Sequence, residues 1–317
     1  MRYFVTGGCG FIGSHMVDRL MAIKDAQVTV YDNLSMGETR LIEHHLKDKR
    51  FKFIEEDLLD KKALEKAIKG HDMVHHIAAN SDVRKGHGQP LLDLEQGPVA
   101  TSNLLEAMRK NGIKKISFCS SSVVYGVPSV YPTPEEYGPT MPVSLYGAGK
   151  LGCEGLISAY TNTYGFQAWI FRFANIIGPR ETHGILVDFI NKLKKNPKRL
   201  EILGDGKQRK SYLTVEDCVD AMLHVIEHAK DPVNVYNLGS KDQIEVSRIA
   251  ELLVRELGLK DVKFDYTGGE VGWIGDVKTM FLATEKLDKL GWRARMGSEE
   301  AIVYTIRALK KELWDGN

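Results

Sequence analysis

A tyrosine and a lysine four residues apart form a pair of side chains that could do chemistry. Tyr146 and Lys150 open a stretch of helical spacing that continues to Tyr164, and side chains at positions i and i+4 share one face of a helix. A tyrosine that works as a base near neutral pH must have its pKa lowered from about 10 by roughly 3, at a cost of about 4 kcal/mol. One cation ~5.5 Å away at an effective dielectric of ~20 supplies about 3 kcal/mol. Lys150 therefore needs a second positive charge beside it, and without other motifs the pair would be interpreted as two surface residues of a helix.

A glycine-rich turn near the N-terminus could bind phosphate. Residues 6–14 read Thr-Gly-Gly-Cys-Gly-Phe-Ile-Gly-Ser and lie between the apolar run 2–6 and the helical segment 13–23. Glycines let the backbone turn tightly and approach a pyrophosphate, and the start of the helix then faces the phosphate charge. We therefore predict a dinucleotide at this turn, bound by Gly7, Gly10, Phe11, Ile12 and Gly13.

An acidic residue stands where such a site would bind the adenosine ribose. Asp32 ends the second apolar run, 19 residues after Gly13. A carboxylate there accepts hydrogen bonds from the ribose hydroxyls and repels a 2′-phosphate, so NAD is favoured over NADP. The alternative is that Asp32, together with Asn33, is only a turn residue at the end of a strand.

Three serines follow the fifth apolar run. Residues 119–126 read Cys-Ser-Ser-Ser-Val-Val-Tyr-Gly. They fall at the carboxyl end of a predicted strand, the edge where open α/β sheets bind ligands. A serine there can hydrogen-bond both a phenol and a substrate hydroxyl, although a plain strand-to-loop turn would explain two of the three.

Alternating apolar runs and amphipathic segments would position these residues. Strands are predicted at 2–6, 28–32, 52–54, 72–77 and 114–120, and helices at 13–23, 60–69 and 99–110. This rhythm predicts an α/β fold with a doubly wound parallel (Rossmann) sheet. It loosens after residues 168–174, where we expect a smaller α/β substrate-binding lobe. The predicted dinucleotide domain is 1–174 with about 214–240, and the smaller lobe is about 175–213 with 241–317.

Composition and charge exclude several classes of function. The 317 residues carry a formal net charge of +1, which gives no reason to expect nucleic acid or an anionic membrane as a partner. The four cysteines form no Cys-x-x-Cys pair, as in a reducing compartment. Neither a signal peptide nor an apolar run of the ~20 residues that a membrane span needs is visible. We expect a soluble, cytoplasmic protein.

Two histidine pairs raise the question of a metal. His44-His45 and His75-His76 are adjacent in sequence. Neighbouring residues on a strand point to opposite faces, and no third ligand follows either pair at metal spacing. We therefore expect no metal site.

Together these motifs resemble the extended short-chain dehydrogenase/reductases, and in particular the NAD-dependent sugar epimerase/dehydratase family. The resemblance covers nearly the whole chain. Its further markers are Asp32-Asn33-Leu34-Ser35-x-Gly37, Asp57-Leu58, Ala78-Ala79, Arg172-Phe173-Ala174-Asn175, Gly178-Pro179-Arg180 and Gly204-Asp205-Gly206-x-Gln208.

The resemblance implies roles for individual residues. It implies a catalytic triad of Ser121, Tyr146 and Lys150. The residues that it implies for the NAD site, besides the glycine turn, are Asp32, Asn33, Asp57, Leu58, Ala78, Ala79, Tyr146 and Lys150. Those that it implies for the nucleotide-sugar substrate are Ser121, Ser122, Asn175, Arg209, Lys210 and Asp276.

One position separates the reactions of the family. Relatives that dehydrate or decarboxylate the sugar tend to carry Glu two residues before the Tyr-Gly pair, and many dehydratases add Asp before that Glu. Here those positions are Val123 and Ser122, and a valine cannot move a proton. The chain therefore resembles the UDP-glucose 4-epimerase subgroup. Tyr146 would take the proton of the sugar 4-hydroxyl while the C4 hydride passes to NAD and returns to the other face of a 4-keto sugar.

Other readings stay open. A UDP-glucuronate or UDP-N-acetylhexosamine epimerase, a keto-sugar reductase, and a catalytically inactive dinucleotide-sensing protein would share most motifs. The chain also departs from the family pattern. Trp273-Ile274-Gly275-Asp276 replaces Arg-Pro-Gly-Asp, Lys210 stands where Arg is common, and Gly97-Pro98 replaces Asn-Val.

A homodimer is also expected. The helix after Pro98 and the helix that starts at Tyr146 carry apolar positions beyond what one sheet face needs, and in the family these two helices pair across a two-fold axis. The positions concerned are Leu104, Met108, Leu151, Leu156 and Ile157.

Overall fold

The computed structural model describes residues 1–81, 88–273 and 275–315. The chain divides into two compact units, and each is described by itself. The first unit comprises Met1–Val124, Thr140–Arg172 and Met222–Tyr236, and the second comprises Tyr125–Pro139, Phe173–Ala221 and Asn237–Asn317. Among the described residues, no helix has the length and apolar character that crossing a membrane requires.

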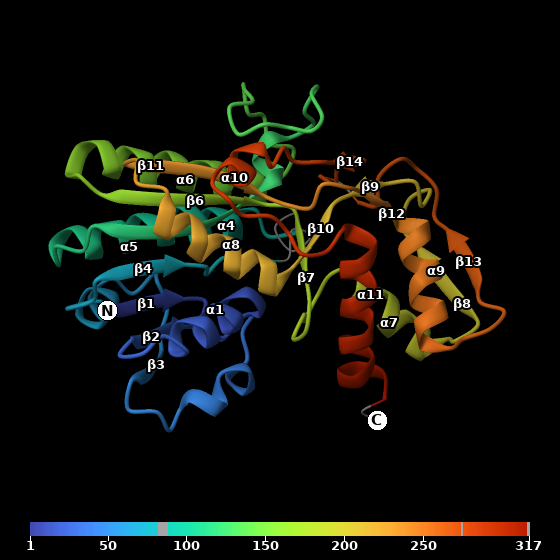
Figure 1. The fold of residues 1–317 in the computed structure, drawn as a ribbon, viewed down its shortest axis with the longest axis horizontal. Coiled ribbons are helices and arrows are strands. Elements are labelled where there is room, and N and C mark those ends of the chain that lie inside the picture. The colour runs from blue at the N-terminus through green and yellow to red at the C-terminus, as the bar shows by residue number, and fades with distance from the viewer. Residues whose placement is uncertain (82–87, 274, 316–317) are drawn as a thin grey trace. The chain divides into compact units, whose positions relative to one another are not determined.

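A seven-stranded sheet runs through the first unit in the order β11-β6-β5-β4-β1-β2-β3 (Figure 1). Its strands are β1 (Arg2–Thr6), β2 (Gln27–Asp32), β3 (Phe51–Glu55), β4 (Met73–His76), β5 (Lys115–Ser121), β6 (Gln167–Phe173) and β11 (Val233–Leu238). The pairs β1–β2, β1–β4, β2–β3 and β4–β5 are parallel. The strand order reverses between β1 and β4, as in a doubly wound sheet. The predicted fold class is confirmed.

Helices and short turns connect these strands. The helices are α1 (Phe11–Met21), α2 (Lys61–Ala67), α4 (Pro90–Leu94), α5 (Ala100–Lys110), α6 (Leu145–Tyr164) and α8 (Val215–His228), of which α8 belongs to the first unit from Met222 onward. The turns are η1 (Thr39–Leu41), η2 (Glu43–His45), η3 (Glu95–Val99) and η4 (Ser122–Tyr125). Leu64 of α2, Leu104 of α5 and Ile157 of α6 share one apolar core with Phe4 of β1 and Ile116 of β5. Burial of one apolar face of each helix therefore holds these helices against the sheet.

This core changes the argument for a dimer. Leu104, Met108 and Ile157 are completely buried within the single chain, so they leave no apolar surface for a second copy. Leu151 and Leu156 are half-buried. The apolar side chains of three other residues are more exposed, namely Leu91, Leu94 and Val99. They lie on and next to α4, which packs against α6. A homodimer stays a prediction, and the exposed residues around α4 replace the buried positions as its candidate interface.

The second unit has three small sheets, in the orders β10-β7, β12-β9-β14 and β13-β8. The strands are β7 (Asn175–Ile177), β8 (Arg199–Ile202), β9 (Arg209–Lys210), β10 (Tyr212–Thr214), β12 (Ile244–Glu245), β13 (Lys263–Tyr266) and β14 (Thr279–Met280). The helices are α7 (Ile185–Lys195), α9 (Val246–Leu257), α10 (Glu285–Lys289) and α11 (Ser298–Leu309), followed by the turn η5 (Lys310–Trp314). Leu193 of α7, Leu252 of α9 and Ile302 of α11 are completely buried in the core of this unit.

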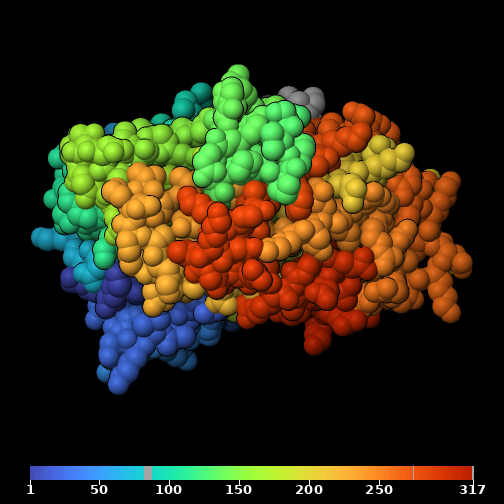
Figure 2. All heavy atoms as spheres, turned by 45° about the horizontal axis from the view of Figure 1, so that its top comes forward, coloured from blue at the N-terminus to red at the C-terminus, as the bar shows by residue number. Residues whose placement is uncertain are grey.

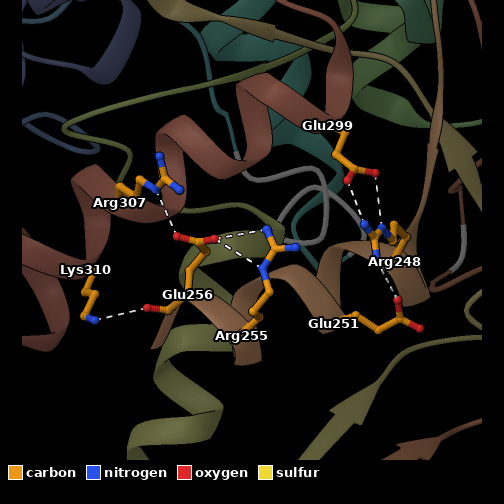
Figure 3. Close-up of polar contacts among 7 residues, drawn as sticks. All are labelled: Arg248, Glu251, Arg255, Glu256, Glu299, Arg307 and Lys310. Carbon is orange, nitrogen blue, oxygen red and sulfur yellow. Dashed lines mark hydrogen bonds and ion pairs between the residues drawn. The ribbon is translucent and has the colours of Figure 1, made fainter. Parts of the chain in front are cut away.

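Exposed ion pairs join α9 to α11 on the outside of that core (Figure 3). Arg248 reaches Glu299 with two hydrogen bonds of 2.7 and 3.1 Å, and Arg307 reaches Glu256 at 2.9 Å. The side chains of Arg248 and Glu299 are 43% and 50% exposed. Water screens such pairs, so each contributes less than about 1 kcal/mol to stability. The buried leucines and isoleucines therefore provide most of the stabilisation between these helices.

The segment 125–139 belongs to the second unit. Thr133 donates its N–H to the carbonyl of Phe281 and accepts from the N–H of Ala283, at 2.8 and 2.9 Å. Atoms of the segment 125–139 lie at the surface on the face shown in Figure 2, where they are green. Within this segment, the apolar side chains of Val127 and Val130 are exposed. Hydrogen bonds to the C-terminal part of the chain, rather than position in the sequence, therefore decide where this segment belongs.

The two histidine pairs lie in different structures. His75 and His76 are on strand β4, as the sequence indicates, and both are buried. His44 and His45 are on the turn η2 and not on a strand. The argument that adjacent histidines point to opposite faces is therefore wrong for His44 and His45, because a tight turn lets both rings lean the same way.

Candidate active site

The glycine turn between β1 and α1 has no space for side chains. Gly7 adopts φ +71°, and a Cβ there would lie 2.6 Å from the backbone N of Ala78. A Cβ on Gly13 would lie 1.9 Å from the carbonyl oxygen of Gly7. Gly10 precedes α1, whose first turn begins with Phe11 and Ile12 and contains no acidic residue. The backbone N–H groups at the start of α1 are therefore suited to an anion, and the turn fits a dinucleotide pyrophosphate.

Asp32 is held at the end of β2 by backbone donors. Its carboxylate accepts hydrogen bonds from the N–H groups of Cys9 and Leu34, both at 2.9 Å. Burial raises the pKa of Asp32, and these two hydrogen bonds act in the opposite direction. The hydrogen bond from Leu34 is the one expected of a turn residue, which is the alternative role that the sequence leaves open for Asp32. The bond to Cys9 fixes the carboxylate beside the glycine turn, where a ribose would follow the pyrophosphate.

Asn33 and Asp57 are in direct contact although 24 residues separate them. The Asn33 side-chain amide donates to the Asp57 carboxylate at 2.7 Å. Asp57 also accepts from the N–H of Leu59 at 2.8 Å. Leu58, between them, is 5% exposed and belongs to the apolar core. The predicted residues of the adenosine side therefore gather at the ends of β2 and β3.

Ala78 and Ala79 line a pocket with Phe118, Tyr146 and Lys150. The pocket lies wholly within the first unit. Of the predicted cofactor residues, the structure therefore brings the two alanines and the Tyr–Lys pair to one cavity. Ser121 is not among the described residues that line it.

The start of helix α6 sets the position of Tyr146. Ser144 accepts a hydrogen bond from the N–H of Gly147 at 3.1 Å and thereby caps the helix, as a serine before a first turn often does. One turn later Lys150 is 6% exposed. Its ammonium donates to the carbonyl oxygen of Cys119 at 2.6 Å and lies 5.6 Å from the centre of the Tyr146 ring. The predicted Tyr–Lys pair therefore shares one face, with the lysine anchored to strand β5.

His76 adds no positive charge beside Lys150, because its imidazole is neutral. It is buried and shares hydrogen bonds with Thr6 at 2.8 Å and Thr101 at 2.9 Å. Burial, helped by the charge of Lys150, lowers the pKa of His76 to about 3. Lys150 is therefore the cation that faces Tyr146 from this side.

The three serines after Cys119 differ in their surroundings. Ser120 is buried and donates to the Glu154 carboxylate at 2.5 Å. Ser121 ends β5, is half-buried, and accepts a hydrogen bond of 3.4 Å from the N–H of Val123. Ser122 begins the turn η4 and is 9% exposed. Ser121 is therefore the serine at the strand edge that keeps access to solvent, as expected of a group that meets substrate.

Sequence reasoning missed a buried ion pair behind this edge. Glu154 follows Lys150 by one turn of α6 and accepts two hydrogen bonds from Arg172, at 2.7 and 3.0 Å. The side chains of Arg172 and Glu154 are 10% and 7% exposed. Because Glu154 also binds Ser120, it links α6, β5 and β6 next to the candidate triad. Its spacing of four residues from Lys150 was the available signal.

A second missed group is Asp93, on α4. It lines the same pocket as Tyr146 and Lys150 and is 5% exposed. Asn80 donates to one of its oxygens at 2.8 Å. The other oxygen has no hydrogen-bond partner among the described residues. No motif in the sequence points to Asp93, because only the fold carries α4 to this pocket.

Of the candidate substrate residues, Ser121 and Ser122 lie in the first unit, and the other four lie in the second. Asn175 begins β7 and donates to the Ser211 carbonyl at 3.4 Å. Lys210 pairs with Asp276 at 2.6 Å, their side chains being 14% and 5% exposed. Arg209 is 57% exposed and lies 3.9 Å from Glu245. Ile274, within the motif that ends at Asp276, lies outside the described residues.

Strand β9 directs two cations, which the sequence did not distinguish as phosphate ligands, to opposite faces. Arg209 and Lys210 are consecutive on this strand, so their side chains point to opposite faces. Lys210 is directed to Asp276 and also lies 5.2 Å from the Trp273 ring. Its register partner on β14 is Met280. Only one of the two cations can therefore belong to a given site.

Comparisons with known proteins match the whole chain. The model of the family described as NAD dependent epimerase/dehydratase matches residues 3–239. A putative UDP-glucose 4-epimerase of Methanocaldococcus jannaschii is 32% identical over 312 residues, covering 96% of this chain and 97% of that protein. The crystal structure of a UDP-galactose 4-epimerase is 41% identical with a TM-score of 0.88, covering 99% of this chain and 100% of that one. That of the Thermus thermophilus UDP-glucose 4-epimerase, in complex with NAD, is 30% identical with a TM-score of 0.84, covering 98% and 99%.

Proposed function

Because this chain belongs to the NAD-dependent epimerase/dehydratase family, we propose that it epimerises a nucleotide sugar at C4, interconverting UDP-glucose and UDP-galactose. Three relatives named UDP-glucose or UDP-galactose 4-epimerase, at 30–41% identity, support this choice of sugars. NAD is the cofactor. The glycine turn would hold its pyrophosphate, and Asp32 and Asn33 its adenosine ribose.

The residues of the first unit supply proton chemistry at oxygen. Bound NAD supplies a hydride acceptor at the sugar carbon and a donor for the return step. Tyr146 takes the proton of the sugar 4-hydroxyl, and Lys150 favours the phenolate by its charge. Ser121 at the strand edge orients the hydroxyl. Lys150 can stabilise the Tyr146 phenolate without moving, because the Cys119 carbonyl already holds its ammonium.

One observation carries the choice of epimerisation. Positions 122 and 123, where relatives that eliminate or decarboxylate carry acids, hold a serine and a half-buried valine. Neither side chain can exchange a proton with a sugar carbon near neutral pH. The groups at this edge therefore move protons at oxygen and none at carbon, so hydrogen would leave and return to carbon only as the C4 hydride. Asp93 is a carboxylate of the adjoining pocket, so the decisive test must detect proton exchange at carbon.

For the substrate diphosphate we propose Lys210 and Asn175. The Lys210 ammonium is already paired with the Asp276 carboxylate. A substrate diphosphate would therefore have to bind this ammonium alongside Asp276 or displace the Asp276 carboxylate from it. A lysine also offers a point charge in place of the bidentate fork of arginine. We expect Arg209, on the other face of β9, to contribute little. Arg209→Ala and Lys210→Ala separate these roles, because only the second should raise the KM for the nucleotide sugar.

The test is turnover in deuterated buffer, with the product followed by mass spectrometry and proton NMR. The purified protein is incubated with UDP-, GDP-, CDP- and dTDP-sugars, uronates and N-acetylhexosamines included, without added cofactor and with added NAD or NADH. We expect isomer interconversion of UDP-glucose and UDP-galactose, with unchanged mass and no deuterium on carbon. Loss of water or carbon dioxide, or deuterium on carbon, would overturn 4-epimerisation. Preference for a uronate or an N-acetylated sugar would overturn the choice of hexose, and a requirement for added NADH would indicate a reductase.

A further inference from the structure

Two imidazoles and one carboxylate converge on the outside of the first unit. His44 and His45 lie on η2, in the connection between β2 and β3. The Nε2 atoms of both rings approach the same oxygen of Asp18, on α1, at 2.8 and 2.7 Å. The three candidate ligand atoms all lie within 4.8 Å of one another. Three residues from two separate elements therefore present ligand atoms to one point.

These distances are near those that a small divalent cation requires. Zinc bonds to nitrogen and oxygen are about 2.0–2.2 Å in a tetrahedral geometry, so neighbouring ligand atoms are about 3.4 Å apart. The observed separations of 2.8 and 2.7 Å between Nε2 and the carboxylate oxygen are shorter than this, because protons between the atoms now form hydrogen bonds. A slight opening of the cluster, with loss of the protons between the atoms, would admit an ion.

The cluster is both ordered and accessible. The His45 side chain is 16% exposed, and its ring packs on that of Phe51 with centres 5.6 Å apart. The His44 side chain is 47% exposed. One ring is thus fixed by packing while the other opens to solvent, so water can complete the coordination.

We propose that Asp18, His44 and His45 form a binding site for a divalent transition-metal ion of the zinc class. Two imidazole nitrogens with one carboxylate are ligands that Zn²⁺, Ni²⁺ and Co²⁺ accept, whereas Mg²⁺ and Ca²⁺ prefer oxygen. The bound ion links α1 to the connection between β2 and β3. It takes no part in the proposed epimerisation.

The link would reach the glycine turn through that connection. Glu38 donates its N–H to the Cys9 carbonyl at 2.9 Å. A Cβ on Gly37 would lie 2.8 Å from Cys9, so the connection packs closely on the turn. An ion that holds η2 against α1 therefore stiffens the segment next to the dinucleotide turn.

The test is calorimetric titration of the whole protein with ZnCl₂ at pH 7.5, after treatment with a chelator. We expect one ion per chain. His44→Gln and Asp18→Asn should each weaken binding at least about tenfold, since even outer-shell changes at metal sites cost 10–100-fold. With Co²⁺, the wild-type protein alone should show a saturable visible absorption.

A second histidine pair provides the control. His224 and His228 stack on α8 with ring centres 4.1 Å apart, and residues at i and i+4 can also hold a metal. His228→Gln should leave Zn²⁺ binding unchanged. The proposal is wrong if the wild-type protein binds no Zn²⁺, if His44→Gln and Asp18→Asn bind as the wild type does, or if only His228→Gln loses binding. Circular dichroism verifies that each variant is folded. Because His44 is exposed, His44→Gln is the variant that should disturb folding least.

Discussion

Replacing Glu154 by glutamine should destabilise the protein far more than its modest change in shape suggests. The substitution removes the negative charge that two hydrogen bonds join to Arg172, at 2.7 and 3.0 Å. The guanidinium stays where it is, with 10% of its side chain exposed. Removing one partner of a buried ion pair costs about 3–5 kcal/mol, because the other buried charge loses the counter-charge that this partner provides. Since glutamine keeps one acceptor for Ser120 or Arg172, we expect about 3 kcal/mol.

The chain supplies a control with the same geometry and different burial. Glu299 meets Arg248 with two hydrogen bonds as well (Figure 3), but their side chains are 50% and 43% exposed. Glu299→Gln should therefore cost less than about 1 kcal/mol. Urea unfolding followed by circular dichroism measures both variants against the wild type, with the slope verified as unchanged.

A double variant isolates the cause. If the cost arises from the loss of the Glu154 counter-charge, then adding Arg172→Gln to Glu154→Gln should restore part of the lost stability. The reasoning is refuted if Glu154→Gln and Glu299→Gln cost the same, or if the two buried substitutions are additive. Because Glu154 also binds Ser120, next to Ser121, we further expect kcat to fall more than KM changes in the folded fraction of Glu154→Gln.

Four other predictions follow from the site and the fold. Tyr146→Phe should bind NAD and nucleotide sugar normally and lose turnover by orders of magnitude; a near-normal rate would remove the phenol from the mechanism. Asp32→Asn removes the charge and keeps only one of the two oxygens that accept from the N–H groups of Cys9 and Leu34, so NAD should bind more weakly and discrimination against NADP should narrow, as fluorescence titration would show. Burial lowers the pKa of His75 and His76 to about 3, below the unfolded value of about 6.5, so the unfolded chain binds more protons and stability should fall below about pH 6.5 by up to ~1.4 kcal/mol per pH unit for each histidine. Denaturant unfolding at pH 7 and pH 5 tests this, and equal stabilities would contradict it. Light scattering at micromolar concentration should give a dimer, against the 35.6 kDa of one chain, and substituting Asp for exposed Leu94 should shift it toward monomer.

Local patterns in the sequence determined the order of the fold and the chemistry at its strand ends. Apolar runs located β1, β2, β4 and β5, because a parallel strand covered on both faces is apolar along most of its length, whereas β3 lies at the sheet edge and is only partly buried. The glycine turn and the Tyr146–Lys150 spacing depend on backbone geometry over a few residues, so a single sequence reveals them. The end of the strand indicated only that one of three serines could meet substrate, whereas the choice of Ser121 came from the family resemblance and stays a prediction.

Only the tertiary structure decided which distant side chains meet. Glu154 with Arg172, Lys210 with Asp276, and Asp93 in the pocket depend on crossovers that bring separate elements together, and no local period records them. His44 and His45 show the limit most clearly, since adjacency on an assumed strand argued against a shared site. A turn in place of the strand directs both rings to Asp18, 26 and 27 residues away in sequence. Periodicity reports the face that an element buries, whereas the partner of a polar side chain is set by how separate elements pack.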